Sequence, residues 1–126
     1  MTEKTAAEKM RIKPGTTVAL LHTPEGFAEL LGLPEDVSVV GDPKRADTVI
    51  AFAGTQVEVE ERLPAMLKAA TAKTALWVVY PKGSKAAGLD ISRDTIWPFA
   101  EALGMRPVGM VSVDGRWSGF RLKPPV

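Results

Sequence analysis

Hydrophobic and polar positions along this 126-residue chain follow two periods, one typical of strands and one typical of helices. Apolar or β-forming runs predict six strands, at residues 17–21, 37–40, 48–53, 75–80, 108–113 and 117–123. Apolar residues at helical spacing predict three helices, at about 24–31, 57–71 and 92–103. Glycines and prolines separate these segments, so strands and helices follow one another in turn.

Local residues predict how some of these elements begin and bend. Thr23 is a good N-cap, and Pro24 suits the first turn of the helix that follows. Pro64 lies inside the second helix and removes a hydrogen bond, so we expect a kink or a restart there. Asp114-Gly115, between the last two strands, favours a type I′ hairpin in which both central residues take positive φ.

The order of the elements predicts a doubly wound α/β fold. Strands that alternate with helices form a mostly parallel six-stranded sheet with helices on both faces, and the last two strands add a C-terminal antiparallel hairpin. We expect a single domain over residues 14–126, with residues 1–13 as a flexible lead-in. A hairpin strand at the edge of the sheet can pair with its copy, which predicts a homodimer.

Composition and charge narrow the classes of function. The 16 basic and 15 acidic residues give a net charge of +1, which argues against a dedicated nucleic-acid-binding protein. The absence of cysteine excludes disulfides and a thiolate nucleophile, and a single histidine leaves no typical metal site. No apolar run approaches the roughly 20 residues of a membrane span. The polar start has no secretory pattern, so we expect a cytoplasmic protein.

Three groups of residues carry a resemblance to known proteins: Tyr80-Pro81-Lys82, Ser92-Arg93-Asp94 with Trp97, and residues 117–122. Through them the chain resembles, over roughly residues 15–124, a family of short bacterial proteins catalogued as a domain of unknown function. The order of its elements is also similar to the methyltransferase-like variant of the Rossmann fold, which closes with an antiparallel hairpin. The resemblance implies a degenerate fold of that kind and carries no chemistry with it.

The loop after the first strand departs from the methyltransferase pattern. Methyltransferases resemble one another in a glycine-rich loop at this point, where the backbone approaches the cofactor. Here the loop is residues 22–26, in which only Gly26 is a glycine and Pro24 lacks a backbone donor. We therefore predict no cofactor, and the loop argues against S-adenosylmethionine in the usual pose. Asp42 is a faint counterpart of the ribose-binding acid, and the interval before residue 48 has no room for a full strand–helix unit.

Ligands of open α/β sheets bind outside the carboxyl ends of the strands. His22 ends the first strand and is a candidate catalytic base, although a lone histidine there can simply cap backbone groups or face water. The loop after the fourth strand and the helix that follows it offer candidates for anion or ligand binding, namely Lys82, Ser84, Lys85 and Arg93. A solvated surface loop is the commoner outcome for such residues. No phosphate-binding Walker motif and no nucleophile elbow is present.

Several aromatic and acidic residues are expected to be structural. Trp117, Gly119 and Arg121 share one face of the last strand, where the arginine stem can cover the indole. They form either a stacking platform for a flat ligand or part of the core, and we favour the core. Trp77 and Trp97 are also expected in the core. The acids of the long helix are expected to form its solvated face: Glu58, Glu60 and Glu61.

These observations favour one hypothesis of function over its rivals. We interpret the chain as a non-catalytic, methyltransferase-like binding module that lacks the glycine-rich cofactor loop. The alternative is a small enzyme or ligand-binding protein that acts on an anionic small molecule at the C-terminal ends of the strands, with His22 as acid or base. The expected partners are a second copy, a small anionic ligand or another protein, rather than a membrane or a nucleic acid.

Overall fold

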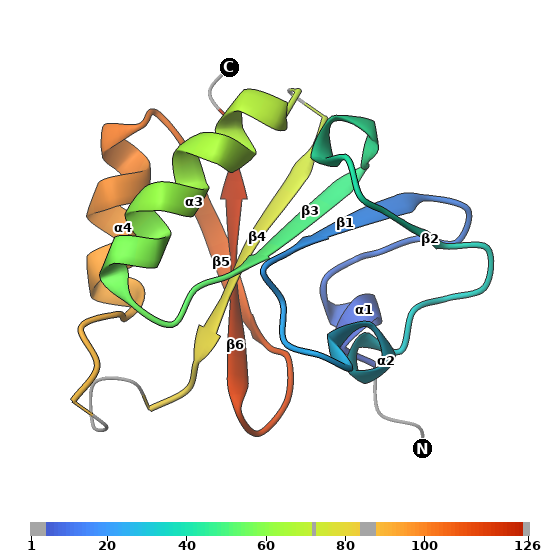
Figure 1. Cartoon of the computed structure of the whole chain (residues 1–126), viewed down its shortest axis with the longest axis horizontal. Helices are drawn as coiled ribbons and strands as arrows, with labels where there is room; N and C mark the ends of the chain where they lie inside the picture. The colour runs from blue at the N-terminus through green and yellow to red at the C-terminus, as the bar shows by residue number, and fades with distance from the viewer. Residues whose placement is uncertain (1–4, 72, 84–87, 125–126) are drawn as a thin grey trace.

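The computed structural model describes residues 5–71, 73–83 and 88–124 and shows a mixed sheet with helices on both faces (Figure 1). Its strands are β1 (Thr17–Leu21), β2 (Ser38–Val40), β3 (Thr48–Phe52), β4 (Ala75–Pro81), β5 (Arg106–Ser112) and β6 (Trp117–Lys123). Its helices are α1 (Ala6–Lys9), α2 (Phe27–Leu31), α3 (Gln56–Ala69) and α4 (Arg93–Ala102), with a short 3-10 helix, η1 (Pro43–Arg45).

The six strands lie in the order β2-β1-β3-β4-β6-β5. The first four are parallel, and β6 runs antiparallel to both of its neighbours, β4 and β5. This arrangement confirms the predicted doubly wound fold with its C-terminal hairpin. Between β2 and β3 the chain forms only η1, so this connection holds no strand–helix unit, as its length predicts.

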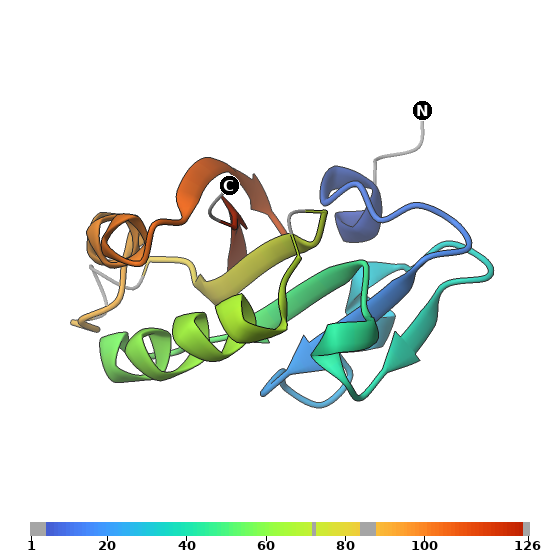
Figure 2. The same cartoon turned by 90° about the horizontal axis from the view of Figure 1, so that it is seen from above.

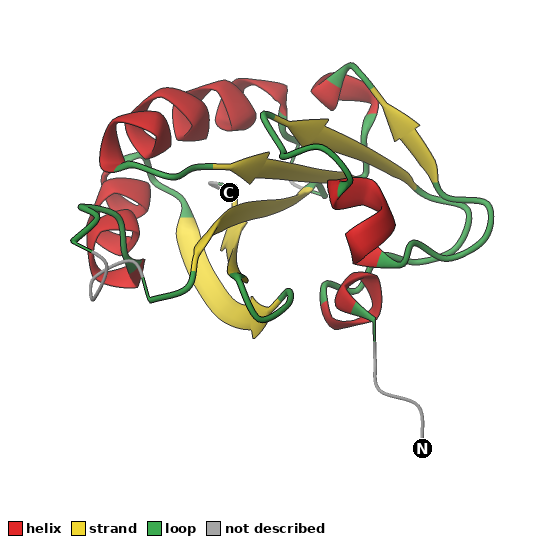
Figure 3. Ribbon diagram, turned by 60° about the horizontal axis from the view of Figure 1, so that its bottom comes forward, coloured by secondary structure: helices red, strands yellow, loops and turns green. Residues whose placement is uncertain are grey.

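Two apolar clusters hold the helices against opposite faces of the sheet. Alternate residues of β3 show the division, since Val49 belongs to the cluster under α3 and α4, and Ile50 to the cluster under α1 and α2. Figure 2 shows α3 and α4 side by side, and Figure 3 shows α1 next to α2. Trp77 is fully packed in the second cluster, as predicted. Trp97 is instead 41% exposed, because only part of its ring packs, on Phe120.

The start of the chain belongs to the packed domain, which corrects the boundary expected at residue 14. Thr5 and Glu8 form a capping box at the beginning of α1. Ala7, Met10 and Ile12 are buried in the second cluster. The segment appeared to be a lead-in because charged residues separate its few apolar ones. Those apolar residues nevertheless face the sheet together, so the packed unit begins before residue 14.

The beginning of α2 and the course of α3 also differ from the prediction. Gly26, with φ at +81°, is the N-cap of α2, so Thr23 and Pro24 precede the helix rather than begin it. α3 runs without a restart through Pro64. Proline removes one backbone donor from the helix, and the helix is held on the sheet by buried side chains such as Leu63.

The loop between β5 and β6 is closed by a side chain and not by a type I′ turn. Neither Asp114 nor Gly115 has positive φ, which rules out the predicted turn type. Instead, Oδ1 of Asp114 accepts hydrogen bonds from the backbone N–H groups of Arg116 and Trp117, at 2.7 and 2.9 Å. The Asp-Gly pair therefore predicts the position of the hairpin correctly. The aspartate closes the loop with its side chain and not with the backbone conformation of a type I′ turn.

The last strand in the sheet order, β5, lies at an edge, with Val108 and Met110 exposed at 48% and 40%. The edge position is what pairing with a second copy requires, and the homodimer stays a prediction. Within the described ranges no helix has the length and apolar character needed to cross a membrane.

Burial of Met10 gives a direct test of the packed N-terminal segment. Met10 is 1% exposed, so Met10→Ala removes contacts from the core and leaves a cavity. We expect it to lower the free energy of unfolding by about 2–5 kcal/mol, measured by urea denaturation. Met110→Ala is the matched control, since Met110 is 40% exposed, and it should cost much less. Equal, small effects of the two changes would mean that α1 is not docked.

Candidate functional site

The carboxyl ends of β1, β3 and β4 lie together at one edge of the sheet, as predicted. In the parallel register Leu21 pairs with Ala51, and Phe52 pairs with Val79. The loops that leave these three strands therefore begin side by side. This edge is where open α/β folds bind their ligands, so its side chains decide whether a ligand fits.

The β1–α2 loop leaves little space at this edge. His22 is exposed and has φ at +59°, a left-handed conformation that turns the chain away from β1. Below it, a pocket of about 80 Å³ is bounded by residues 24–27 and by Leu30, Arg116 and Trp117. Ligand pockets usually measure about 300–1,000 Å³. The pocket is therefore too small for a nucleotide-sized molecule.

Aromatic side chains fill the space above the end of β3. The rings of Phe52 and Trp117 meet edge to face, with centroids 5.0 Å apart and planes at 90°. The guanidinium of Arg116 lies 5.7 Å from the centre of the Trp117 ring, on the outer side, and pairs with Asp114 at 3.6 Å. Trp117 is half-buried against the second cluster. It serves as packing, in line with the core interpretation.

Two of the predicted anion-binding residues, Lys82 and Arg93, contact different partners and do not converge on one site. The ammonium group of Lys82 donates to the hydroxyl of Ser112, on the far side of the hairpin. Arg93 begins α4, and its guanidinium lies 3.8 Å from the carboxylate of Asp94. In the part of the chain that the structure describes, no hydrogen bond or ion pair joins Lys82 or Arg93 to His22. Ser84 and Lys85 lie outside the described residues.

Glu58 is not on the solvated face that the helical pattern predicts. Its Oε1 accepts from the backbone N–H of Gly54 at 2.8 Å, and its Oε2 lies 2.9 Å from Nη2 of Arg62. Arg62 in turn donates to the carbonyl of Phe52, so the acid and the base tie α3 to the end of β3. The Gly54 N–H, followed by the attraction of Arg62, lowers the pKa of Glu58. The other two acids are exposed, as predicted: Glu60 and Glu61.

Tyr80 is a buried phenol near the end of β4 that the sequence-based list of sites did not include. It is 5% exposed, and its hydroxyl lies 3.8 Å from the sulfur of Met110. Burial raises the pKa of Tyr80, while the positive charge of Arg93 partly opposes this. The hydroxyl therefore stays protonated at neutral pH and contributes packing rather than acid–base chemistry.

Asp42 follows β2 at the position of the ribose-binding acid, but its carboxylate is engaged locally. Its Oδ1 accepts from the backbone N–H of Lys44 at 3.0 Å and caps η1. The residue is exposed and points along its own loop.

A pocket of ligand size lies elsewhere, on the face of the sheet that carries α1. It measures about 460 Å³, and its lining includes Lys9, Arg11, Trp77 and Arg121. Sequence analysis missed it because residues 1–13 were placed outside the domain and because Arg121 was assigned to the indole of Trp117. The available signal was the two-residue period of β6, which puts Arg121 and Lys123 on one face, opposite Phe120.

Comparison with solved structures finds Rossmann-like folds at low sequence identity. A protein of the NADB-Rossmann superfamily from Streptococcus agalactiae is 9% identical and gives a TM-score of 0.58 over 99% of this chain and 70% of that one. The ribosomal protein L11 methylase of Lactobacillus delbrueckii subsp. bulgaricus is 11% identical and gives a TM-score of 0.60 over 96% of this chain and 75% of that one. The B. subtilis M1A22 tRNA methyltransferase TrmK is 11% identical and gives a TM-score of 0.55 over 98% of this chain and 67% of that one.

These similarities establish the methyltransferase-like Rossmann fold and nothing finer. Some other similar structures are much longer, since the chain covers 57% of a MtNAS structure and 47% of TrmN from Thermus thermophilus. No family of known sequences matches the chain, and no curated protein matches it.

The lowered pKa of Glu58 predicts a pH-dependent contribution to stability. A folded-state pKa below the ordinary value of 4.5 means that the stabilisation is present above that value and is lost as the pH falls through the folded-state pKa. Glu58→Gln should therefore lower the free energy of unfolding by about 1 kcal/mol near neutral pH. The difference should vanish in acid, as measured by urea denaturation across pH. Glu60→Gln is the exposed control; a pH-independent effect of Glu58→Gln would contradict the interpretation.

Proposed function

We propose that this chain is a non-catalytic, methyltransferase-like Rossmann domain that works as a binding module. The observation that carries the proposal is the state of the carboxyl-end edge, where the fold would hold a methyl-donor cofactor. The scaffold is kept there, while the pocket that its described residues form beside the β1–α2 loop measures only about 80 Å³. A domain that keeps its sheet and closes its cofactor crevice is suited to binding through another surface.

The β1–α2 loop supports this proposal residue by residue. A cofactor-binding loop presents backbone N–H groups and lacks Cβ atoms that would block close approach. Here Pro24 offers no N–H group. His22 carries a side chain at φ +59°, a backbone conformation that favours glycine. The helix that follows has only five residues, so few aligned peptide dipoles point at an anion there.

The adjoining residues support the same proposal. Asp42 uses Oδ1 of its carboxylate to cap η1, which holds the side chain toward its own loop. The edge-to-face pair of Phe52 and Trp117 occupies the space above β3. The residues present therefore do not fit S-adenosylmethionine in its usual pose, and we assign no step of chemistry to that cofactor.

The alternative, an enzyme or ligand-binding protein for an anionic small molecule at this edge, has weaker support. It needs His22 near the basic residues of the next loops. Lys82 is bound to Ser112 and Arg93 faces Asp94. We therefore place the partner, whether a protein or a small anionic ligand, outside the carboxyl-end edge.

The test is a direct measurement of cofactor binding by isothermal titration calorimetry on the full chain. We expect no saturable heat with S-adenosylmethionine or its demethylated product, with the ribosomal protein L11 methylase as the positive control. A thermal-shift assay provides an independent reading, since a ligand at about 100 times its Kd stabilises a protein by about 2.7 kcal/mol. Saturable micromolar binding of either compound would overturn the proposal.

A further inference from the structure

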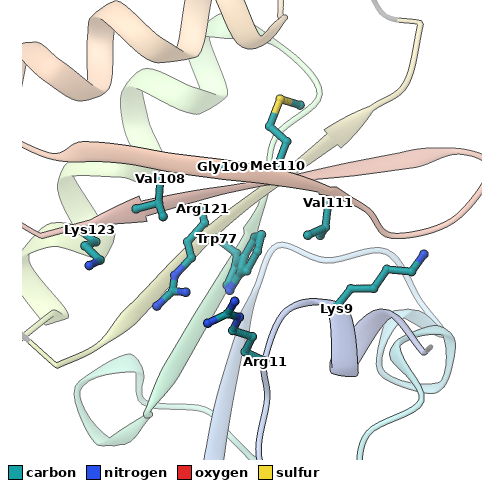
Figure 4. Close-up of a pocket in the computed structure, with 9 residues that line it drawn as sticks. All are labelled: Lys9, Arg11, Trp77, Val108, Gly109, Met110, Val111, Arg121 and Lys123. Carbon is teal, nitrogen blue, oxygen red and sulfur yellow. The ribbon is translucent and has the colours of Figure 1, made fainter.

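The pocket on the α1 face lies at the opposite end of β4 from the cofactor edge. Its volume is about 460 Å³, within the range of small-molecule sites. Its floor is the face of β4 and β6 that carries Trp77 and Arg121 (Figure 4). Lys9 at the end of α1 and Arg11, two residues further on, form one wall. Neither α1 nor α2 is long enough to cover this half of the sheet, so the face stays open here.

Positive charge dominates this pocket. Four of the lining residues are cationic and, in the part of the chain that the structure describes, none is acidic: Lys9, Arg11, Arg121 and Lys123. Lys9 uses its ammonium group to bind the carbonyl of Ser112 at 3.0 Å. The other three cations have no ion pair with any described residue. Uncompensated charge in a concave site raises the local concentration of anions.

Two buried donors in the pocket lack acceptors. The indole Nε1 of Trp77 and the Nε of Arg121 are both buried and form no hydrogen bond. Trp77 is only 2% exposed, so a ligand reaches its N–H when a neighbouring side chain of the pocket moves aside. An unpaired buried donor costs roughly 1–3 kcal/mol. Figure 4 shows the guanidinium groups of Arg11 and Arg121 near the edge of Trp77 that carries the nitrogen, where a single anionic group would supply the missing acceptors.

The backbone of Arg11 is an independent sign of selection for function at this place. The N–H of Arg11 binds the carbonyl of Glu8 at 3.1 Å, and the N–H of Ile12 binds that of Ala7 at 2.9 Å. This pair of bonds is a Schellman motif, which ends α1 and puts Arg11 at φ +60°. Glycine is strongly preferred there, since a residue with Cβ is strained by roughly 1 kcal/mol or more. An arginine at this position gives up stability and places a cation at the pocket.

A second pocket adjoins the first and extends its charge. It measures about 340 Å³, shares Arg11 and Arg121, and adds Lys13 and Lys73. Its one carboxylate, Asp47, already accepts from the N–H and the hydroxyl of Thr17, at 2.9 and 3.1 Å. The cationic side chains that line the two adjoining pockets match a ligand with more than one negative charge.

We propose that this pair of pockets binds a phosphorylated small molecule that carries a pyrophosphate or two phosphate groups. The terminal oxygens lie between Arg11 and Arg121 and accept the indole N–H of Trp77. The organic part of the ligand packs on Val108 and Val111, which also line the first pocket. This site is separate from the carboxyl-end edge, so it goes beyond the proposed function and stands whether or not that proposal holds.

The experiment is calorimetric titration of the full chain with inorganic pyrophosphate and with adenosine diphosphate at constant ionic strength. We expect saturable binding of both. Arg121→Gln should weaken it by about ten-fold or more, since it removes a charge-assisted hydrogen bond. Trp77→Phe removes the N–H together with part of the ring and leaves a cavity in the core. It should weaken binding by about two- to ten-fold, and its melting temperature is measured alongside. Arg93→Gln, at the other edge of the sheet, is the matched control and should leave the affinity unchanged.

Arg11→Gly separates binding from folding. Glycine relieves the left-handed strain, so the melting temperature should stay the same or rise. The affinity for pyrophosphate should nevertheless fall by about ten-fold, because a cation is lost. A fall in affinity together with loss of folding would point to a structural role and contradict the proposal.

Other outcomes would overturn the small-ligand assignment. Failure of both pyrophosphate and adenosine diphosphate to bind would contradict the proposal. Binding of only single-stranded RNA, or of only vesicles with phosphoinositide headgroups, would also contradict it. Titrations with these two macromolecular probes therefore accompany the main experiment. Binding of pyrophosphate that Arg93→Gln weakens and Arg121→Gln does not would place the anion site at the carboxyl-end edge instead. S-adenosylmethionine binding is measured separately, so failure of either proposal is recognised without the other.

Discussion

The structure depends on one constraint, which is that the central parallel strands β1, β3 and β4 are apolar on both faces and must be covered on both. α3 and α4 do this on one face with 14 and 10 residues. The opposite face receives α1 and α2, of four and five residues. These are enough to bury the half of the sheet around Val18 and Ile50, and α1 meets β5 only at its end, where Lys9 binds Ser112. Charged side chains of β6 therefore line the uncovered half.

A short connection also shapes the carboxyl-end edge. With only η1 between β2 and β3, the sheet ends at β2 and the loop that would flank a cofactor has no further strand behind it. The side chains at this edge turn to each other. Glu58 contacts Arg62, Phe52 contacts Trp117, and Asp42 caps η1. Among the described residues, the two buried donors without acceptors, on Trp77 and Arg121, lie on the other face.

Much of the fold could be predicted from the sequence because its signals are local. The strands at Thr17–Leu21 and Trp117–Lys123 begin and end where the pattern of apolar residues places them. The type of hairpin could not be predicted, since Asp-Gly permits positive φ without requiring it and the carboxylate of Asp114 offered another closure. The exposure of Trp97 and the docking of residues 5–12 depend on which surface is left over after the sheet has formed. No local pattern contains that information.

For the candidate site, the sequence predicted the position of the residues and not the contacts of their side chains. Topology alone gave the correct edge for His22 and Lys82, because parallel strands must end together. It did not give the direction of their side chains, which is set by partners as distant in sequence as Ser112. The cationic pocket combines residues near both ends of the chain, so only the assembled sheet brings Arg11 to Arg121.

The hydrogen bond from Lys9 to Ser112 joins residues that are 103 positions apart. A contact of such sequence separation forms late, because the loop it closes must first be paid for in chain entropy. α1 can pack on α2 and on the strands around Val18 and Ile50, whereas its contact with Ser112 waits until the hairpin of β5 and β6 has been made. The link between α1 and the hairpin is thus among the last contacts to form. The cationic pocket between them is complete only once the final strand is in place.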